Sequence, residues 1–177
     1  MKTTWMTPVL CGLAALLSVS SAGADKGGAQ PFGATIDVSE QFIPTDVPGV
    51  NNVVLDGAGL GAHLGQLTFA ATELIDFRQF FRPDLFPSPQ AVVTDGEMTI
   101  TAANGDQLTA TYDGYGVPDP SRPGFFNGFA TATLTGGTGR FRCASGTVPF
   151  TLDINAAALT EVITFDGSAN LWCNGDH

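Results

Sequence analysis

Apolar and polar residues alternate with a period of two along most of the chain, which is typical of β-strands that bury one face. In residues 98–102 and 108–112 every second residue is apolar, and threonine fills the positions between. The Asn104-Gly105 pair lies between these two runs, and such a pair readily adopts the positive φ angles of a tight turn. The pattern therefore predicts an antiparallel hairpin across residues 98–112.

The same reading predicts about eight strands. Besides the hairpin, strand-like segments occur at residues 34–38, 53–56, 63–72, 126–134, 148–152 and 159–169. Pro149 falls inside one of them and cannot donate a ladder hydrogen bond, so it predicts a bulge or irregularity in that strand. Because closure into a barrel removes the edges of a meander, we predict an all-β fold: a single antiparallel, roughly eight-stranded closed β-barrel with little helix.

One aromatic segment, DFRQFFRPDLFPSPQ at residues 76–90, departs from the alternation and is predicted to be a long loop. Four phenylalanines among prolines cannot all be exposed without cost, so they either plug one end of the barrel or line and cover a pocket mouth or partner surface. Arg78 and Arg82 could meet a ligand carboxylate, or could form a solvated rim with local acidic residues. The candidate ligand-binding residues are Phe77, Arg78, Phe80, Phe81, Arg82 and Phe86.

The first 24 residues have the features of a secretory signal peptide: Lys2, an apolar stretch over residues 9–19, and the small residues Ala22-Gly23-Ala24. The apolar stretch is shorter than the roughly 20 residues of a membrane span. We therefore expect export to the periplasm or the extracellular space, without integral membrane association. Residues 25–32 are expected to be a disordered N-terminal segment, and residues 33–177 the β-barrel domain.

The chain is acidic, with 7 basic and 17 acidic residues and a formal net charge of −10. Nucleic acids and anionic membrane surfaces are polyanions that would repel it, so neither is expected as a partner. The glycine-, serine- and aspartate-containing segments lack the spacing of a phosphate loop, a nucleophilic serine or a calcium loop. We therefore predict no metal and no cofactor.

Two cysteines, Cys143 and Cys173, remain after the predicted cleavage. Export would place them where thiols oxidise, so we predict a disulfide between them. It would close a loop of about thirty residues and stabilise the fold by roughly 3 kcal/mol in the chain-entropy model. The alternatives are two free thiols or a metal site, although two cysteines alone make a poor zinc motif.

His63 and Glu161 are the candidate catalytic residues. If Leu64 faces solvent, alternation places His63 inside the barrel, where an imidazole could act as a general base or orient a ligand carbonyl. The alternative is a structural histidine bonded to a backbone carbonyl. Glu161 shares its strand parity with Ile163 and Phe165, so it either points inward with a raised pKa or lies solvated at the rim.

Three segments of the chain resemble the allene oxide cyclase barrel-like family: HLGQLTF at residues 63–69, TAANGDQLTATYDG at 101–114 and LTGGTGRFRCASGTV at 134–148. The last is similar to a GGTGxFxxAxG pattern shared by these calycin-like barrels, which include plant cyclases and dirigent proteins. The resemblance implies the barrel fold, exported bacterial members of unassigned function, and dimers or trimers. It carries over no catalytic residue, and Cys143 stands where the pattern holds a small residue.

We predict that the protein binds a small apolar ligand or a protein partner without catalysing a reaction. The alternatives are a cyclase or isomerase that steers a reactive apolar intermediate, as the resemblance implies, and a packed structural barrel. The barrel interior separates them: an open apolar cavity favours binding, and a cavity holding His63 with a carboxylate favours catalysis. A solid core favours the structural role, and its members would be Met98, Ile100, Phe126, Phe150 and Phe165.

Overall fold

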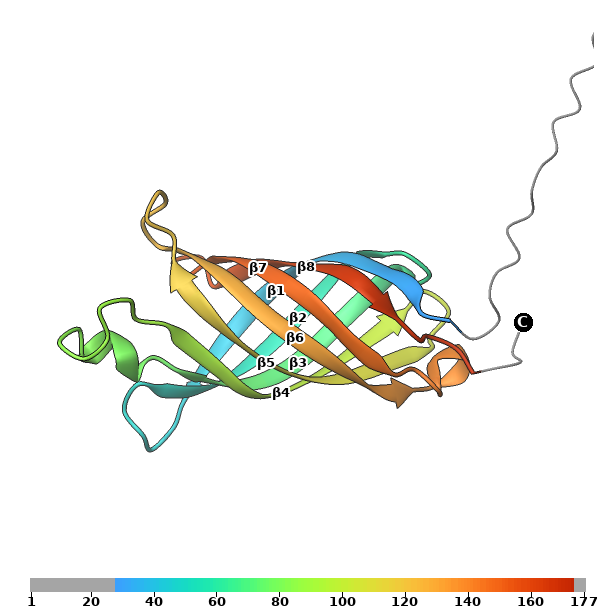
Figure 1. Ribbon diagram of the computed structural model, residues 1–177, viewed down its shortest axis with the longest axis horizontal. Helices are drawn as coiled ribbons and strands as arrows, with labels where there is room; N and C mark the ends of the chain where they lie inside the picture. The colour runs from blue at the N-terminus through green and yellow to red at the C-terminus, as the bar shows by residue number, and fades with distance from the viewer. Residues whose placement is uncertain (1–27, 174–177) are drawn as a thin grey trace, which may run out of the picture.

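Eight antiparallel strands form a closed barrel in the computed structural model, which describes residues 28–173 (Figure 1). Each strand pairs with its neighbours in the sequence, and β8 closes the sheet by pairing with β1. The strands are β1 (Gln30–Pro44), β2 (Val50–Gly61), β3 (Gly65–Asp76), β4 (Ala91–Ala102), β5 (Gln107–Pro118), β6 (Phe125–Gly137), β7 (Gly146–Asn155) and β8 (Thr160–Ala169). The helices in this part of the chain are two short 3₁₀ turns, η1 (Arg78–Phe81) and η2 (Gly139–Phe141). The predicted all-β barrel is confirmed.

The predicted hairpin is the connection between β4 and β5. Gly105 has a φ of +87°, which only glycine adopts without strain, whereas Asn104 stabilises the turn through its side chain. The Asn104 amide Nδ2 donates to Asp106 Oδ2 at 2.7 Å, and the Asp106 backbone N–H donates to Asn104 Oδ1 at 3.2 Å. The turn therefore uses one left-handed residue and an asparagine side chain instead of two left-handed residues.

Pro149 interrupts the ladder between β7 and β8 without shifting its register. The ladder runs up to the Phe150–Phe165 pair, and the isolated Ser145–Asn170 bridge beyond it keeps the same register. On the other side of β7, Pro149 pairs with Thr131 in an unbroken register. The predicted irregularity is thus a gap in one ladder, on the side where proline lacks the N–H that pairing needs.

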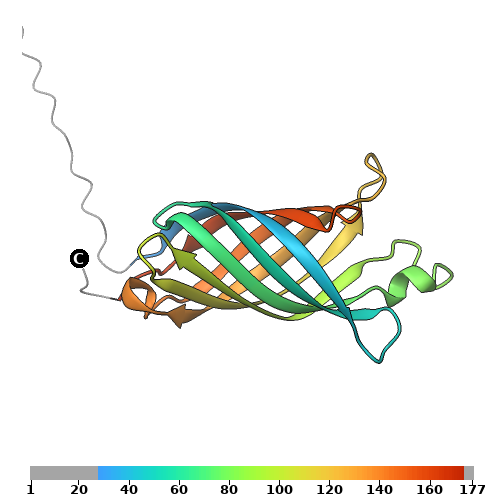
Figure 2. The same cartoon turned by 180° about the vertical axis from the view of Figure 1, so that it is seen from behind.

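The two ends of the barrel differ (Figures 1 and 2). At one end lie the beginning of β1, the end of β8 and the β2–β3, β4–β5 and β6–β7 connections; we call it the capped end. There, Leu64 and Phe141 from two strand connections and Leu171 from the segment after β8 are each at most 1% exposed and belong to the core. The opposite end carries the other four connections, including the long β3–β4 loop with η1, and we call it the open end.

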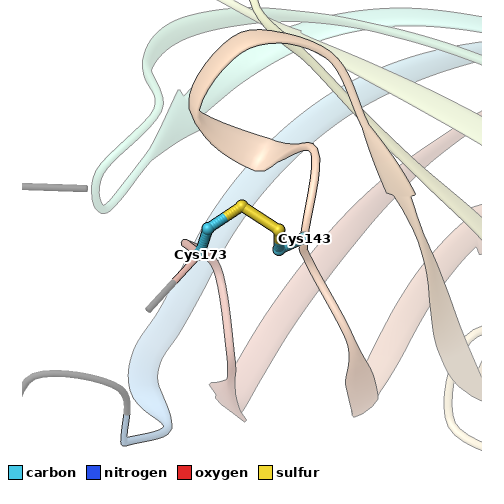
Figure 3. The surroundings of a disulfide bond; sticks show 2 residues. All are labelled: Cys143 and Cys173. Atoms are coloured by element: carbon cyan, nitrogen blue, oxygen red, sulfur yellow. A yellow bond between two sulfur atoms is a disulfide. The ribbon is translucent and has the colours of Figure 1, made fainter. Parts of the chain in front are cut away.

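A disulfide between Cys143 and Cys173 fastens the capped end (Figure 3). Cys143 follows η2, and Cys173 lies in the segment that follows β8, so the bond links the β6–β7 connection to the end of the described chain. The two residues are separated by 30 positions in sequence. The predicted disulfide is confirmed.

The barrel begins earlier than expected. Gln30 to Phe32 belong to β1 and pair with the end of β8, and Phe32 is 1% exposed with its ring 5.5 Å from that of Phe165. The expectation of a disordered segment up to residue 32 is therefore wrong for these three residues. Their local sequence is polar and carries a proline, but pairing with a strand more than 130 positions away orders them. The predicted signal peptide, residues 1–24, lies outside the described residues.

Candidate functional site

A cavity of about 90 Å³ occupies the barrel interior toward the open end. The cavity exists partly because several inward positions of β5 and β6 near the open end are glycines, which have no side chain to fill the interior. At Gly114 and Gly128 a Cβ atom would lie 2.5 Å from Ala130 Cβ and 2.8 Å from Leu152 Cδ1, so these glycines allow close packing of the wall. At Gly116 a Cβ would meet nothing nearer than 3.9 Å, so this glycine leaves empty space.

A column of aromatic rings forms the floor of the cavity. Tyr112 and Phe150 line the cavity with their ring centroids 5.7 Å apart, and Phe150 packs 4.8 Å from Phe165. Phe165 in turn contacts Phe32 edge-on at 5.5 Å. These four side chains are at most 5% exposed. The column therefore connects the lining of the cavity to the packed core.

Aromatic rings also surround the mouth. Phe42, Phe77 and Phe126 line the cavity, and Phe80 links the last two with centroid distances of 6.2 Å to Phe77 and 6.0 Å to Phe126. Phe77 lies 6.1 Å from Phe42 of β1. The β3–β4 loop thus contributes one wall of the mouth through Phe77, with Phe80 supporting it from behind.

Three glutamates from separate strands line this apolar cavity: Glu40 of β1, Glu73 of β3 and Glu161 of β8. Glu73 is 9% exposed and Glu161 5%, whereas Glu40 is half-buried. The Tyr112 hydroxyl donates a hydrogen bond to Glu73 Oε2 at 2.7 Å. Oε1 of Glu40 and Oε1 of Glu161 are buried without a hydrogen-bond partner. Among the described residues that line the cavity, none carries a basic side chain.

Burial shifts the protonation of all three carboxyls. It raises the pKa of Glu40 to about 7, and the nearby Glu73 adds to the effect. It also raises the pKa of Glu73 to about 7, although the hydrogen bond from Tyr112 works in the opposite direction. The pKa of Glu161 is raised well above its usual value by burial and then by the charges of Glu40 and Glu73. Near neutral pH the cavity therefore holds a mixture of carboxylic acids and carboxylates.

Tyr112 stays a hydrogen-bond donor throughout the physiological range. Burial raises the pKa of its hydroxyl, and the charge of Glu73 and the hydrogen bond to it add to this shift. The cavity thus combines the Tyr112 hydroxyl, which stays protonated, with three carboxyls that can take up or release a proton. Such shifts, produced by burial and neighbouring charges in a cleft, are typical of functional sites.

The arginines of the aromatic loop do not reach the cavity. Arg78 donates from Nε to Asp76 Oδ1 at 2.9 Å, and Arg82 donates from Nη2 to Asp84 Oδ2 at 3.2 Å. Both guanidinium groups are more than half exposed. The hydrogen bond from Arg78 also lowers the pKa of Asp76. Of the two predicted alternatives, the structure has the solvated rim with local acidic partners.

The phenylalanines of the same loop divide between two environments. Phe77 lines the cavity and Phe80 packs behind it, whereas Phe81 is 64% exposed and Phe86 39%. The loop therefore neither plugs the barrel completely nor places all four rings in the pocket. Among the six candidate ligand-binding residues, Phe77 alone borders the cavity.

His63 lies far from this site. It occupies the β2–β3 turn at the capped end with a φ of +64°, is exposed, and packs its ring edge-on against Trp172 at 5.2 Å. Leu64, predicted to face solvent, is 1% exposed. The inward placement of His63 is wrong because β2 ends at Gly61 and β3 begins at Gly65, so strand alternation does not extend through the turn. His63 and Glu161 lie at opposite ends of the barrel.

Glu161 points inward, as its parity with Ile163 and Phe165 predicts, and the solvated-rim alternative does not hold. Sequence reasoning did not identify Glu40 and Glu73, the other two carboxyls of the cavity, although strand alternation gave a signal for both. Glu40 continues the inward positions of Ile36 and Val38 in β1, and Glu73 continues those of Leu67, Phe69 and Ala71 in β3. Both lie beyond the predicted ends of their strands, at residues 38 and 72.

No family model, no curated protein and no solved structure matches this chain. Over residues 28–173, no helix is long and apolar enough to span a membrane. The chemistry of the site therefore has to be inferred from its own residues, since a fold alone does not determine function.

Proposed function

We propose that this protein binds a small, mainly apolar ligand in the cavity at the open end, and that the carboxyls of Glu40, Glu73 and Glu161 recognise its polar group. One observation carries the proposal. An aromatic cavity contains two buried carboxyl oxygens, Oε1 of Glu40 and Oε1 of Glu161, that have no hydrogen-bond partner in the protein.

Buried polar groups without partners cost free energy, on the order of 1–3 kcal/mol each and more when charged. Three acidic groups at one end of an otherwise apolar interior are therefore unfavourable for a barrel whose only task is to fold. A ligand that supplies the missing partners removes this cost when it binds. Apolar walls with a few convergent polar groups are also the usual composition of a small-molecule site.

The cavity argues against the packed structural barrel. Met98, Ile100, Phe150 and Phe165 are at most 4% exposed, which is the solid core expected for that role. Phe126, the fifth residue of that expected core, instead lines the cavity, and Gly116 leaves space beside it. Packing is thus complete toward the capped end and incomplete toward the open end.

A second candidate function is proton transfer on a reactive apolar substrate, as in a cyclase or isomerase. The Tyr112–Glu73 pair favours it, because a carboxyl with a pKa of about 7 beside a phenolic donor can take up and return a proton near neutral pH. The resemblance to allene oxide cyclase-like barrels agrees with this candidate. Here the proton-transfer groups would be glutamates and Tyr112, with no part for His63.

We also propose that the chain is exported to the periplasm or the extracellular space. The predicted signal peptide supports this, and the Cys143–Cys173 disulfide fits an oxidising compartment. A homo-oligomer, implied by the family resemblance, stays a prediction that size-exclusion chromatography with light scattering can check.

Native mass spectrometry with organic extraction tests the binding proposal. The protein is purified with its disulfide intact, and the compounds bound to it are compared with those bound to Gly116→Val. The valine side chain of this variant would occupy the space beside Gly116 in the cavity. Gly33→Val is the matched control, because a Cβ there meets only the Phe165 carbonyl oxygen, at 3.8 Å, away from the cavity. We expect an apolar compound in the wild type and the control and its loss in Gly116→Val.

The binding proposal fails on a different result. If the wild type carries no compound and 2-phenylethanol, added as a neutral aromatic probe, binds no better to it than to Gly116→Val, the cavity is not a ligand site. A His63→Ala variant should retain the compound, since His63 lies at the other end of the barrel.

A further inference from the structure

The balance of hydrogen-bond donors and acceptors in the cavity is strongly one-sided. The polar side chains that line it are the three glutamates, Tyr112, whose hydroxyl already donates to Glu73, and Tyr115, which is 42% exposed. Oε1 of Glu40 and Oε1 of Glu161 remain without donors, and Glu161 is only 5% exposed. Acceptor oxygens therefore outnumber the donors, which are the tyrosine hydroxyls and any carboxyl that is protonated.

A protonated amine is the group that corrects this imbalance. An ammonium group carries three N–H donors and no acceptor, and it brings the positive charge that the cavity lining lacks. A neutral acceptor such as a ketone would use the proton of one carboxylic acid and leave the remaining carboxyl oxygens unpaired. A ligand carboxylate would add a fourth acidic group and be repelled.

We infer that the ligand of this cavity is a small hydrophobic primary amine, whose ammonium group is received by Glu40, Glu73 and Glu161 and whose apolar body packs against the aromatic rings. This inference rests on the proposed binding function and names the class of its ligand. Three strands that meet only in the closed barrel, β1, β3 and β8, supply the three carboxyls. The recognition site therefore exists only in the folded chain.

The aromatic lining suits the same class of ligand. Tyr112 and Phe150 line the cavity, and aromatic rings attract cations as well as apolar groups. A volume of about 90 Å³ is of the same order as the cavity of about 150 Å³ that takes up benzene in an engineered protein core. One ring or a short alkyl chain is the body that fits, with the mouth at the open end leaving room for a substituent.

A metal ion is a poorer occupant than an amine. Within residues 28–173, no group of three or more His, Cys, Asp or Glu side chains is arranged so that it could hold a metal ion. The three glutamates interact electrostatically, but they are not arranged as a metal-binding group. The net charge of −10 favours the approach of any cation, so the selection for an organic amine comes from the apolar walls.

Isothermal titration calorimetry with three matched probes tests the inference on the disulfide-bonded protein. The probes are 2-phenylethylamine, its neutral counterpart 2-phenylethanol, and the anion 3-phenylpropanoate. At pH 7.5 we expect the amine to bind at least ten-fold more tightly than the alcohol, and the anion to bind more weakly than both. Equal or tighter binding of the alcohol overturns the amine inference but leaves the apolar-ligand proposal standing.

A pair of isosteric variants locates the effect. Glu161→Gln keeps the size of the side chain but removes its charge, and we expect a loss of amine affinity of ten-fold or more with a much smaller change in alcohol affinity. Glu97→Gln is the matched control, because it changes net charge equally on the exposed outer face of β4. If both variants weaken the amine equally, the amine responds to overall charge and the site assignment is wrong.

The pH dependence gives an independent readout. The titratable groups that line the cavity are Glu40 from β1, Glu73 from β3, Tyr112 and Tyr115 from β5 and Glu161 from β8, while β4, β6 and β7 contribute apolar side chains and glycine. Because the pKa values of Glu40 and Glu73 are about 7, amine affinity should rise several-fold from pH 5.5 to 7.5. Alcohol affinity should not rise, and an amine affinity that is flat over this range contradicts the inference. If none of the probes binds and Gly116→Val changes nothing, the proposed function itself fails.

Discussion

The two ends of this barrel are built from the same eight strands and the same alternation, yet their interiors are opposites. Toward the capped end, large apolar side chains such as Ile36, Phe141 and Leu171 are fully buried, and a disulfide links the β6–β7 connection to the segment after β8. Toward the open end, the interior holds glycines, aromatic rings and three carboxyls around a cavity. The capped end therefore supplies the stability that allows the open end to hold buried carboxyls without hydrogen-bond partners.

The largest effect should come from removing an aromatic side chain at the capped end. Phe141→Ala deletes a ring that is 0% exposed, and we expect the free energy of unfolding to fall by about 3–5 kcal/mol. Phe77→Ala at the open end removes a partly exposed ring and should cost about 1 kcal/mol. Urea denaturation of both variants measures the difference. Equal losses would mean that the two ends do not divide stability as proposed.

The disulfide should account for the next largest effect. Replacing Cys143 and Cys173 together by serine opens a loop with a sequence separation of 30, and we expect a loss of about 3 kcal/mol. The bond lies at the capped end, so affinity for 2-phenylethylamine should not change. Urea denaturation and calorimetry on the same double variant measure both quantities. A variant that is folded at the titration temperature but no longer binds would show that the ends are coupled.

Glu161→Gln should stabilise the protein at neutral pH by about 1–3 kcal/mol, because glutamine is neutral, whereas the Glu161 carboxyl must take up a proton or carry a buried, unpaired charge when the chain folds. The sign of the pH dependence follows from the raised pKa values. Between pH 4.5 and about 7 the folded chain binds more protons at Glu40 and Glu73 than the unfolded chain does, so their contribution is full below pH 4.5 and is lost as pH rises.

The pKa of Glu161 is shifted in the same direction, so its contribution is also lost with rising pH. Urea denaturation of wild type and Glu161→Gln from pH 5 to pH 8 should therefore show a stability difference that grows with pH. A constant difference would mean that the Glu161 carboxyl does not titrate with a raised pKa. Glu97→Gln serves as the exposed control.

Gly116→Val should have the smallest effect on stability. Its Cβ has ordinary contacts at 3.9 Å and beyond, and valine suits a strand better than glycine, so a gain of about 0.5–1 kcal/mol is expected. Ligand binding should nonetheless be lost. A marked destabilisation, measured by thermal unfolding, would show that a valine side chain does not fit into the cavity beside Gly116.

Much of the fold could be predicted from the sequence because its determinants are local. Alternation located all eight strands, the Asn104-Gly105 pair located a turn, and strand parity gave the inward position of Glu161 as one of two alternatives. Strand ends were less predictable. The β1 and β3 segments were expected to end at residues 38 and 72, so Glu40 and Glu73 fell just outside the inward pattern that would have identified them.

The rest of the site depends on relations that the local sequence does not contain. Three carboxyls share one cavity because β1 closes against β8 and the barrel brings β3 to the same chamber. His63 was misplaced for a related reason: the β2–β3 turn directs Leu64 into the core and leaves the imidazole outside. Alternation applies only while the chain is extended, so a residue in a turn cannot be assigned to a face from parity.

The most direct test of the central claim, that the open end encloses a buried acidic chamber which receives a cation, is an NMR titration of the glutamate side-chain carboxyl carbons. We expect midpoints of about 7 for Glu40 and Glu73, a midpoint for Glu161 well above its usual range, and a downward shift of all three when 2-phenylethylamine is added. Midpoints close to 4.5 for the three groups, unchanged by the amine, would contradict it.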